Sequence, residues 1–116
     1  MSQAIKIGII GAGSAQFSAG FVNDLCRTEG LAGSHVTMMD IDAERVATMQ
    51  KLAVRYADEL GVDYTFEATT DRQAALQDAD FVVNLAYVKG HYHARAVREL
   101  TAEHGYYYGG VNLGSW

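Results

Sequence analysis

The sequence predicts an α/β domain in which helices cover a parallel sheet, and two segments carry that prediction. Residues 5–10 form an apolar, β-branched run that breaks at Gly11, Ala12 and Gly13 before helix-forming sequence begins. A second apolar run, VTMMD, ends in the carboxylate of Asp40. A strand, a glycine turn and a helix present backbone N–H groups to a phosphate. Asp40 follows at roughly the 20-residue spacing expected for an acid that holds an adenosine ribose.

The rest of the chain alternates between strand and helix patterns without a linker or a repeat. We expect strands over residues 5–10, 35–40, 64–68 and 81–85. We expect helices over residues 15–29, from Asp42 to Leu60, from Asp71 to Leu76, and over 92–104. This order implies a Rossmann-like, doubly wound parallel sheet with strand order 3-2-1-4 and right-handed crossovers. Residues 1–116 then form a single NAD-binding domain whose second half is incomplete.

Local signals justify the boundaries and the buried faces of these elements. Asp42 and Asp71 are suited to cap helix N-termini, and Gly61 and Gly105 are suited to end helices. The expected apolar faces are Phe17, Phe21, Val22 and Leu25 in the first helix, and Val46, Met49, Ala53, Tyr56 and Leu60 in the second. The fourth strand, FVVNL, is nearly all apolar, which is typical of a strand covered on both faces.

Composition excludes several classes of partner. The net charge of −5 argues against nucleic acid as the main partner, and Lys and Arg form no cluster. No apolar run approaches the roughly 18–20 residues that span a bilayer, and the N-terminus lacks a signal-peptide pattern. The single Cys26 excludes an intrachain disulfide and suggests an inert core thiol. We therefore expect a cytoplasmic protein that binds neither nucleic acid nor membrane.

The predicted phosphate loop runs from Gly11 to Gln16. Gly11 allows the tight turn, and Gly13 lets the backbone approach a pyrophosphate. Gln16 occupies the position of a third glycine, which normally permits close packing of the helix on the strand. Either the helix sits slightly further off, or Ser14 and Ala15 supply the small residues instead. The Ser14 hydroxyl could also bond to a phosphate.

Asp40 also bears on which nucleotide is bound. A carboxylate at the end of the second strand accepts hydrogen bonds from both ribose hydroxyls and repels the extra phosphate of NADP. No arginine directly follows Asp40, so NAD is favoured over NADP. Domains that bind S-adenosylmethionine use a similar glycine loop and acid, and they are the main alternative on these motifs alone.

Four segments together resemble glycoside hydrolase family 4: GIIGAGSAQFS, MMDID, DADFVVN and KGHYHARAVRELTAEHGYYYGG. That family contains NAD- and metal-dependent α-glucosidases, α-galactosidases and α-glucuronidases. The resemblance covers residues 5–110, in order and with matching spacing. It implies hydrolysis in which NAD oxidises the sugar at C3, a base removes the acidified C2 proton, the C1 substituent leaves, water adds and the hydride returns. A divalent metal, usually manganese, would polarise the C2 and C3 oxygens.

The resemblance assigns individual residues only to cofactor binding. Gly11, Gly13 and Ser14 match the pyrophosphate loop, Asp40 matches the ribose acid, and Asn84 matches an asparagine on the nicotinamide side of the crevice. With the adjoining loop residues, the predicted NAD-binding set is Gly11, Gly13, Ser14, Ala15, Gln16, Asp40 and Asn84.

The family's metal-binding cysteine and histidine, its catalytic tyrosine and its sugar-binding domain belong beyond residue 116. We therefore expect no catalytic or metal-ligating residue in these 116 residues. A glycoside would be a substrate only if a missing segment completed the site, and the chain alone should not hydrolyse it. His91 and His93 form an H-x-H pair without an evident third ligand.

Two other readings of the sequence stay open. The chain could be a non-catalytic dinucleotide-binding module, or a fragment of an NAD-dependent hydroxy-acid dehydrogenase. The tyrosines at positions 106–108 could form an exposed apolar patch, which leads us to expect a homo-oligomer.

Overall fold

The computed structural model describes residues 3–87 and 90–106. The chain divides into two compact units, Met1–Ala86 and Tyr87–Trp116. The first unit contains the sheet, and the second contains helix α4 (Gly90–Glu103).

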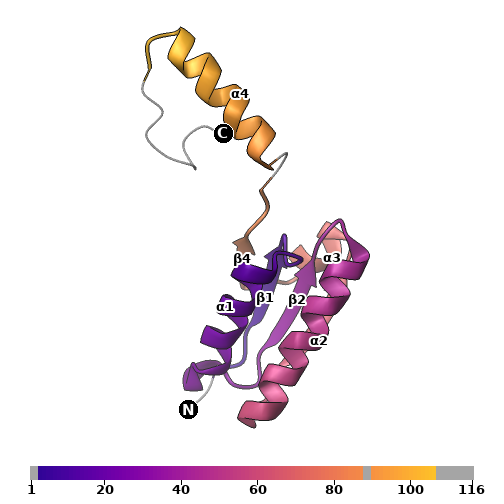
Figure 1. Ribbon diagram of the computed structural model, residues 1–116. Coiled ribbons are helices and arrows are strands. Elements are labelled where there is room, and N and C mark those ends of the chain that lie inside the picture. Colours follow the sequence, from indigo (N-terminus) through magenta and orange to yellow (C-terminus); the bar gives the residue numbers. More distant parts are fainter. Residues whose placement is uncertain (1–2, 88–89, 107–116) are drawn as a thin grey trace. The chain divides into compact units, whose positions relative to one another are not determined.

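The sheet of the first unit is parallel throughout, as predicted (Figure 1). Its strands are β1 (Lys6–Ile10), β2 (His35–Met39), β3 (Thr65–Thr69) and β4 (Phe81–Asn84). They lie in the order β3-β2-β1-β4. The chain therefore builds outward from β1 on one side and then returns to add β4 on the other. This reversal beside β1 is where doubly wound sheets open a crevice for ligands.

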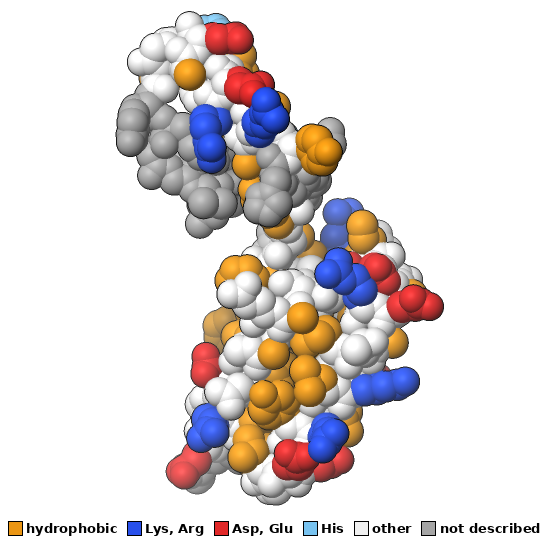
Figure 2. All heavy atoms as spheres, viewed as in Figure 1, with side chains coloured by type: hydrophobic (Ala, Val, Ile, Leu, Met, Phe, Trp, Pro, Cys, Tyr) orange, Lys and Arg blue, Asp and Glu red, His pale blue; other side chains and the backbone are white. Residues whose placement is uncertain are grey.

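Helices α1 (Ala15–Cys26) and α2 (Ala43–Leu60) pack on one face of the sheet. The short helix α3 (Arg72–Leu76) lies against the other face, where the carbonyl of Ala75 contacts Gly8. Because successive strand residues point to opposite faces, alternate residues of each strand enter the main core. That core contains Ile7, Ile9, Val36, Met38 and Phe66 from the strands, and Val22, Leu25, Val46, Met49 and Ala53 from the helices. Figure 2 shows hydrophobic side chains gathering where α1 and α2 meet.

The predicted capping residues Asp42 and Asp71 and the predicted helix-ending glycines Gly61 and Gly105 are confirmed. Asp42 caps α2 by accepting a hydrogen bond from the N–H of Arg45 at 3.1 Å, and Asp71 caps α3 in the same way. Gly61 ends α2 with a φ of 65°, in the left-handed region that suits glycine. Helix α4 closes with paired hydrogen bonds around Gly105, whose φ is 74°.

Helix α1 corrects the prediction in two respects. It ends at Cys26, and residues Glu29–Leu31 form a separate 3₁₀ turn. Phe17 is 62% exposed, because the buried side of the helix is formed by Ser18, Val22, Leu25 and Cys26. On α2, Leu60 is also exposed rather than buried, since it is the last residue of the helix.

Strand β4 is not covered on both faces, contrary to the prediction from its apolar sequence. The side chains of Phe81 and Val82 are 62% and 47% exposed. Their neighbours along the strand are Val83, which packs against the core, and Asn84, which is exposed. Within the described residues β4 is an edge strand that pairs only with β1. An apolar edge of this kind is suited to cover by further polypeptide.

None of the helices in the described part of the chain is both long and apolar enough to span a membrane.

Candidate functional site

The loop that joins β1 to α1 lies at the carboxyl edge of the sheet, at the point where the strand order reverses. Its first three N–H groups turn toward the end of β2. Gly11 and Ala12 both donate to the carbonyl oxygen of Met39 at 2.9 Å, and Gly13 donates to Oδ2 of Asp40 at 2.9 Å. The loop and the predicted ribose acid therefore form one hydrogen-bonded structure.

Asp40 keeps the capacity to accept further hydrogen bonds. Its Oδ2 holds the N–H of Gly13, and its Oδ1 holds the N–H of Asp42 at 3.0 Å. Its own N–H donates to the carbonyl oxygen of Thr69, which ties β2 to β3 at this edge. A carboxylate oxygen has two lone pairs, so each oxygen of this half-buried side chain can accept one more donor. Two neighbouring hydroxyls of a ribose would supply such donors.

Both motif glycines are required by contacts inside the chain. Gly11 has a φ of +87°, and a Cβ there would lie 2.7 Å from the backbone nitrogen of Ala86. This confirms the tight turn expected of the first glycine. A Cβ on Gly13 would lie 2.7 Å from Oδ2 of Asp40. The second glycine therefore makes room for the carboxylate, which sequence reasoning did not foresee.

The first turn of α1 offers N–H groups to an anion. Ser14 is the N-cap residue, but its side chain makes no capping hydrogen bond. The N–H groups of Ala15, Gln16 and Phe17 belong to the first turn, so no carbonyl of the helix itself can accept a hydrogen bond from them. The side chains of all three residues are exposed, so they leave this end of the helix open. A helix N-terminus of this kind carries partial positive charge that suits a phosphate.

Two fully buried small residues at the loop were missed by the sequence analysis. Ala12 and Ser18 have no exposed surface, and the Ser18 hydroxyl donates to the Ala12 carbonyl oxygen at 2.7 Å. Ala15 and Gln16 are exposed and Ser14 is half-buried. None of these three predicted residues therefore takes part in the buried contact. The sequence signal for this contact is a serine on the apolar face of the helix, in line with Val22.

Asn84 is the last residue of β4 and lies beside Ile10 in the strand register. Its side-chain oxygen accepts a hydrogen bond from the N–H of Ala86 at 3.0 Å. Ala86 is also the residue that approaches Gly11. Asn84 therefore belongs to the same edge of the sheet as the loop, and its contact with a nicotinamide stays a prediction.

The described residues contain no group of three His, Cys, Asp or Glu side chains placed to hold a metal ion. The side chain of His91 lies outside the described part of the chain, and His93 is exposed. Of the predicted tyrosine patch, Tyr106 is exposed, whereas residues 107 and 108 lie outside the described residues. Cys26 is buried, and its burial raises the pKa of the thiol, as an inert core cysteine requires.

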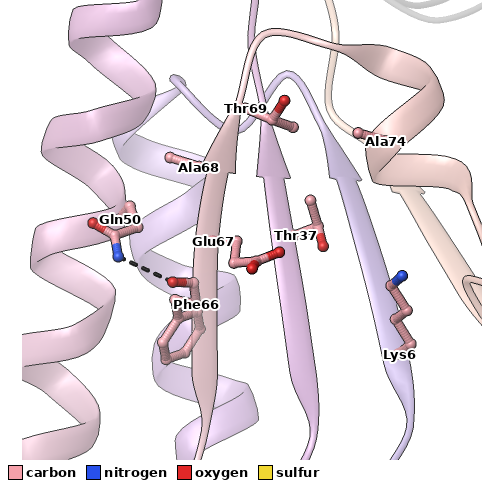
Figure 3. A pocket seen from close by; sticks show the side chains of 8 residues that line it. All are labelled: Lys6, Thr37, Gln50, Phe66, Glu67, Ala68, Thr69 and Ala74. Carbon is pink, nitrogen blue, oxygen red and sulfur yellow. Dashed lines mark hydrogen bonds between the residues drawn. The ribbon is translucent and has the colours of Figure 1, made fainter.

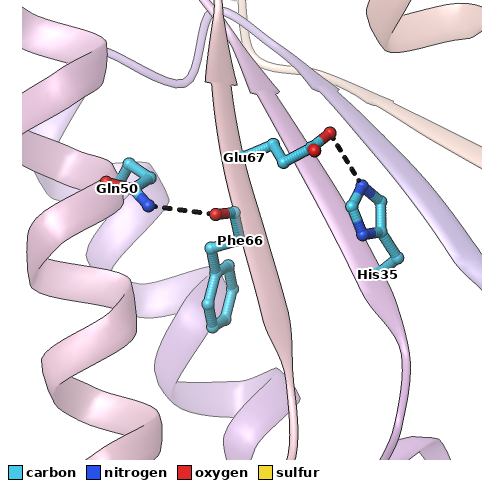
Figure 4. Close-up of polar contacts among 4 residues, drawn as sticks. All are labelled: His35, Gln50, Phe66 and Glu67. Carbon is cyan, nitrogen blue, oxygen red and sulfur yellow. Dashed lines mark hydrogen bonds and ion pairs between the residues drawn. The ribbon is translucent and has the colours of Figure 1, made fainter.

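A second concave region lies along strand β3 and is lined both by side chains of the sheet and by Gln50 of α2. The hollow has a volume of about 580 Å³. Lys6, Thr37 and Glu67 line it from three neighbouring strands (Figure 3). Two of its polar side chains, those of Glu67 and Gln50, already have partners within the chain. Glu67 forms an ion pair with His35 at 3.0 Å, and Gln50 donates to the Phe66 carbonyl oxygen at 3.0 Å (Figure 4). The carboxyl edge, with its open N–H groups, remains the better candidate.

The sheet topology and the glycine loop define a Rossmann-like α/β domain. The sequence pattern of the family 4 glycosyl hydrolases matches residues 6–113. The chain therefore belongs to that family, which confirms the resemblance inferred from its motifs.

Three relatives illustrate the sequence similarity. The chain is 38% identical over 80 residues to an α-glucosidase of Erwinia rhapontici, covering 69% of this chain and 18% of that protein. It is 34% identical over 86 residues to an α-galactosidase of Bacillus subtilis (strain 168), with 74% and 20% covered. It is 33% identical over 112 residues to a 6-phospho-β-glucosidase of Escherichia coli (strain K12), with 91% and 24% covered. The chain thus spans a quarter or less of these relatives' lengths.

Two solved structures share the fold. A 6-phospho-α-glucosidase from gut microorganisms, in complex with NAD and Mn²⁺, superposes with a TM-score of 0.71 at 24% identity, covering 89% of this chain and 24% of that one. A structure of 6-phospho-α-glucosidase from gut microorganisms with NAD and glucose-6-phosphate gives a TM-score of 0.64 at 26% identity, with 90% and 24% covered.

Proposed function

We propose that this chain is the NAD-binding domain of an NAD-dependent family 4 glycosidase. The observation that carries the proposal is the docking of Asp40 on the glycine loop through Gly13. That contact places the carboxylate of Asp40, which can accept further hydrogen bonds, beside the first turn of α1. The N–H groups of that turn have no acceptor within the helix. Asp40 would hold the adenosine ribose, the N–H groups of Ala15 and Gln16 would face the pyrophosphate, and Ser14 could add its hydroxyl.

The edge of the sheet between β1 and β4 would receive the nicotinamide end of the cofactor. Asn84 stands there, next to the loop. NAD supplies a hydride acceptor when it is bound, and this chain's residues bind and orient it. The negative charge of Asp40 favours NAD over NADP, because it would repel a phosphate on the ribose.

We place the remaining parts of a glycosidase site in polypeptide outside the described residues. The described residues do not fit a metal site, so we derive no step through manganese. The relatives and solved structures that support a sugar substrate include α-glucosidase, α-galactosidase and 6-phospho-glucosidases. A glycoside, with or without a phosphate, is accordingly the proposed substrate class of the completed enzyme.

The proposed setting is a cytoplasmic homo-oligomer. A single free cysteine suits a reducing compartment. The exposed side chains of Phe81 and Val82 on the edge strand offer an apolar surface for association.

Calorimetric titration of the 116-residue protein with NAD, NADP and S-adenosylmethionine tests the proposal. We expect saturable binding of NAD, weaker binding of NADP and none of S-adenosylmethionine. Binding of S-adenosylmethionine in preference to NAD would assign the domain to another class of cofactor. Failure of all three ligands to bind would show that these residues do not form a working nucleotide site.

A further inference from the structure

One peptide unit of the loop, between Ala12 and Gly13, is held at both ends by side chains from different elements. The hydroxyl of Ser18, in the first turns of α1, donates to the Ala12 carbonyl oxygen at 2.7 Å. The N–H of Gly13 donates to Oδ2 of Asp40, at the end of β2, at 2.9 Å. Rotation of this peptide unit would break both hydrogen bonds at once.

The Ser18 end of this arrangement is entirely inside the protein. Ser18 and Ala12 are both 0% exposed, so water cannot replace the hydroxyl as a partner for the carbonyl. A buried carbonyl without a partner is costly, and a serine inside a helix is otherwise a poor choice. The backbone N–H of Ser18 also donates to the carbonyl oxygen of Ser14 at 2.9 Å. Ser18 therefore connects the start of α1 to the loop by its backbone and by its side chain.

We infer that Ser18 is a positioning residue of the nucleotide site, an inference that rests on the proposed function. By fixing the Ala12 carbonyl, Ser18 sets the plane of the peptide whose N–H meets Asp40. The ribose acid and the first turn of α1 are thereby held in one mutual geometry before a dinucleotide arrives. A binding site that is ordered in advance loses less conformational freedom when its ligand binds.

The chain offers a matched control for removing this hydroxyl. Ser34 is also 0% exposed, and its hydroxyl donates to a backbone carbonyl, that of Leu31, at 2.6 Å. It precedes β2, whereas Asp40 follows that strand. Ser18→Ala and Ser34→Ala thus each remove a buried hydroxyl that donates to a backbone carbonyl, near the site and away from it. The Ser34 hydroxyl also accepts from the N–H of Ile5 at 3.0 Å, so the control removes more hydrogen bonding than the test variant does. Ser18→Cys fills the space of the hydroxyl with a slightly larger thiol, which is only a weak donor, and so separates packing from hydrogen bonding.

The first readout is NAD affinity, measured by calorimetry at a temperature where circular dichroism shows every variant folded. We expect Ser18→Ala and Ser18→Cys to bind NAD roughly three- to tenfold more weakly than the unaltered chain, as the loss of one buried hydrogen bond implies. Ser34→Ala should bind NAD like the unaltered chain. If Ser18→Ala binds as tightly as Ser34→Ala, the positioning role is wrong.

The second readout needs no nucleotide. Hydrogen exchange of the Gly13 amide, followed by NMR, reports how firmly that N–H is held by Asp40. We expect Ser18→Ala to accelerate Gly13 exchange relative to the Ile9 amide in β1, and Ser34→Ala to leave that ratio unchanged. An unchanged ratio in Ser18→Ala overturns the inference, whatever NAD does. Faster Gly13 exchange relative to Ile9, in a protein that does not bind NAD, would refute the proposed function and support the role of Ser18 in holding the loop.

Discussion

The carboxylate of Asp40 accepts a hydrogen bond from the backbone of Gly13 at 2.9 Å, and it occupies the space that a side chain on Gly13 would need. The two residues are 27 positions apart in the chain. Each depends on the other, because only a glycine admits the carboxylate and the carboxylate gives the N–H a partner. A glycine loop and an acid that occur together in the sequence are thus one structural unit.

Replacing Asp40 by alanine should weaken NAD binding by about 1.5–3 kcal/mol, because charge-assisted contacts to the ribose are lost. Calorimetric titration measures this change. Asp58→Ala is the control, since Asp58 is an exposed acid on α2 and its removal changes the net charge equally. Unchanged affinity in Asp40→Ala would contradict the assigned role.

Gly13→Ala should destabilise the domain by roughly 1–3 kcal/mol, the usual cost of forcing a group into filled space. The added methyl would meet both the carboxylate of Asp40 and the Cβ of Arg45, at 3.1 Å. Denaturation by urea measures the change. Gly20→Ala is the matched control, because a Cβ at Gly20 meets nothing within 4 Å. That helical substitution should stabilise the domain by about 0.5–1 kcal/mol. Equal effects at the two glycines would refute the packing argument.

Alkaline pH should destabilise the domain through Cys26 and Tyr64. Burial raises the pKa of both groups above their ordinary values of 9.0 and 10.0, and the nearby Cys26 raises the pKa of Tyr64 further. At high pH the unfolded chain therefore loses protons that the folded chain retains, so the free energy of unfolding falls as pH rises. This contribution is fully present below the ordinary pKa values.

Urea denaturation at a series of pH values from neutral to about pH 11 would measure this loss. Cys26→Ala removes one of the two groups and should make the decline shallower. A free energy of unfolding that stays constant across this range would show that burial does not perturb these groups.

The exposed edge strand predicts self-association. Val82→Lys places a charge on β4, and charges on edge strands are a common protection against pairing. We expect the unaltered chain to form larger species as its concentration rises, and Val82→Lys to remain monomeric in sedimentation velocity. Leu52→Lys, at a similarly exposed apolar position on α2, should associate like the unaltered chain. A chain that stays monomeric at all concentrations would refute the role of this edge.

The fold was predictable because its signals are local and mutually consistent. Asp42 and Asp71 mark helix starts, Gly61 and Gly105 mark helix ends, and apolar runs of strand length separate them. The strand order follows from the alternation of strands and helices.

The exposure of Phe17 and of β4 was not predictable in the same way. Apolar sequence shows that a residue can be buried, but burial also requires a partner element. The apolar sequence of β4 predicts that Phe81 and Val82 are buried, yet the described residues leave much of both side chains uncovered.

The candidate site was only partly predictable. The sequence identifies Gly11, Gly13 and Asp40 through their spacing, because one motif joins them. It does not reveal that Gly13 makes room for the carboxylate of Asp40, or that Ser18 donates to the Ala12 carbonyl oxygen, since these contacts depend on how α1 lies on the loop.

Mapping NAD-induced changes in amide NMR signals would show where on the domain the nucleotide binds. We predict that the signals of Gly13, Ala15, Gln16 and Asp40, at the carboxyl edge of the sheet, shift as NAD is added. The signals of Thr37 and Glu67, which line the hollow along strand β3, should stay in place. Shifts confined to that hollow, or no shifts at saturating NAD, would contradict NAD binding at the carboxyl edge.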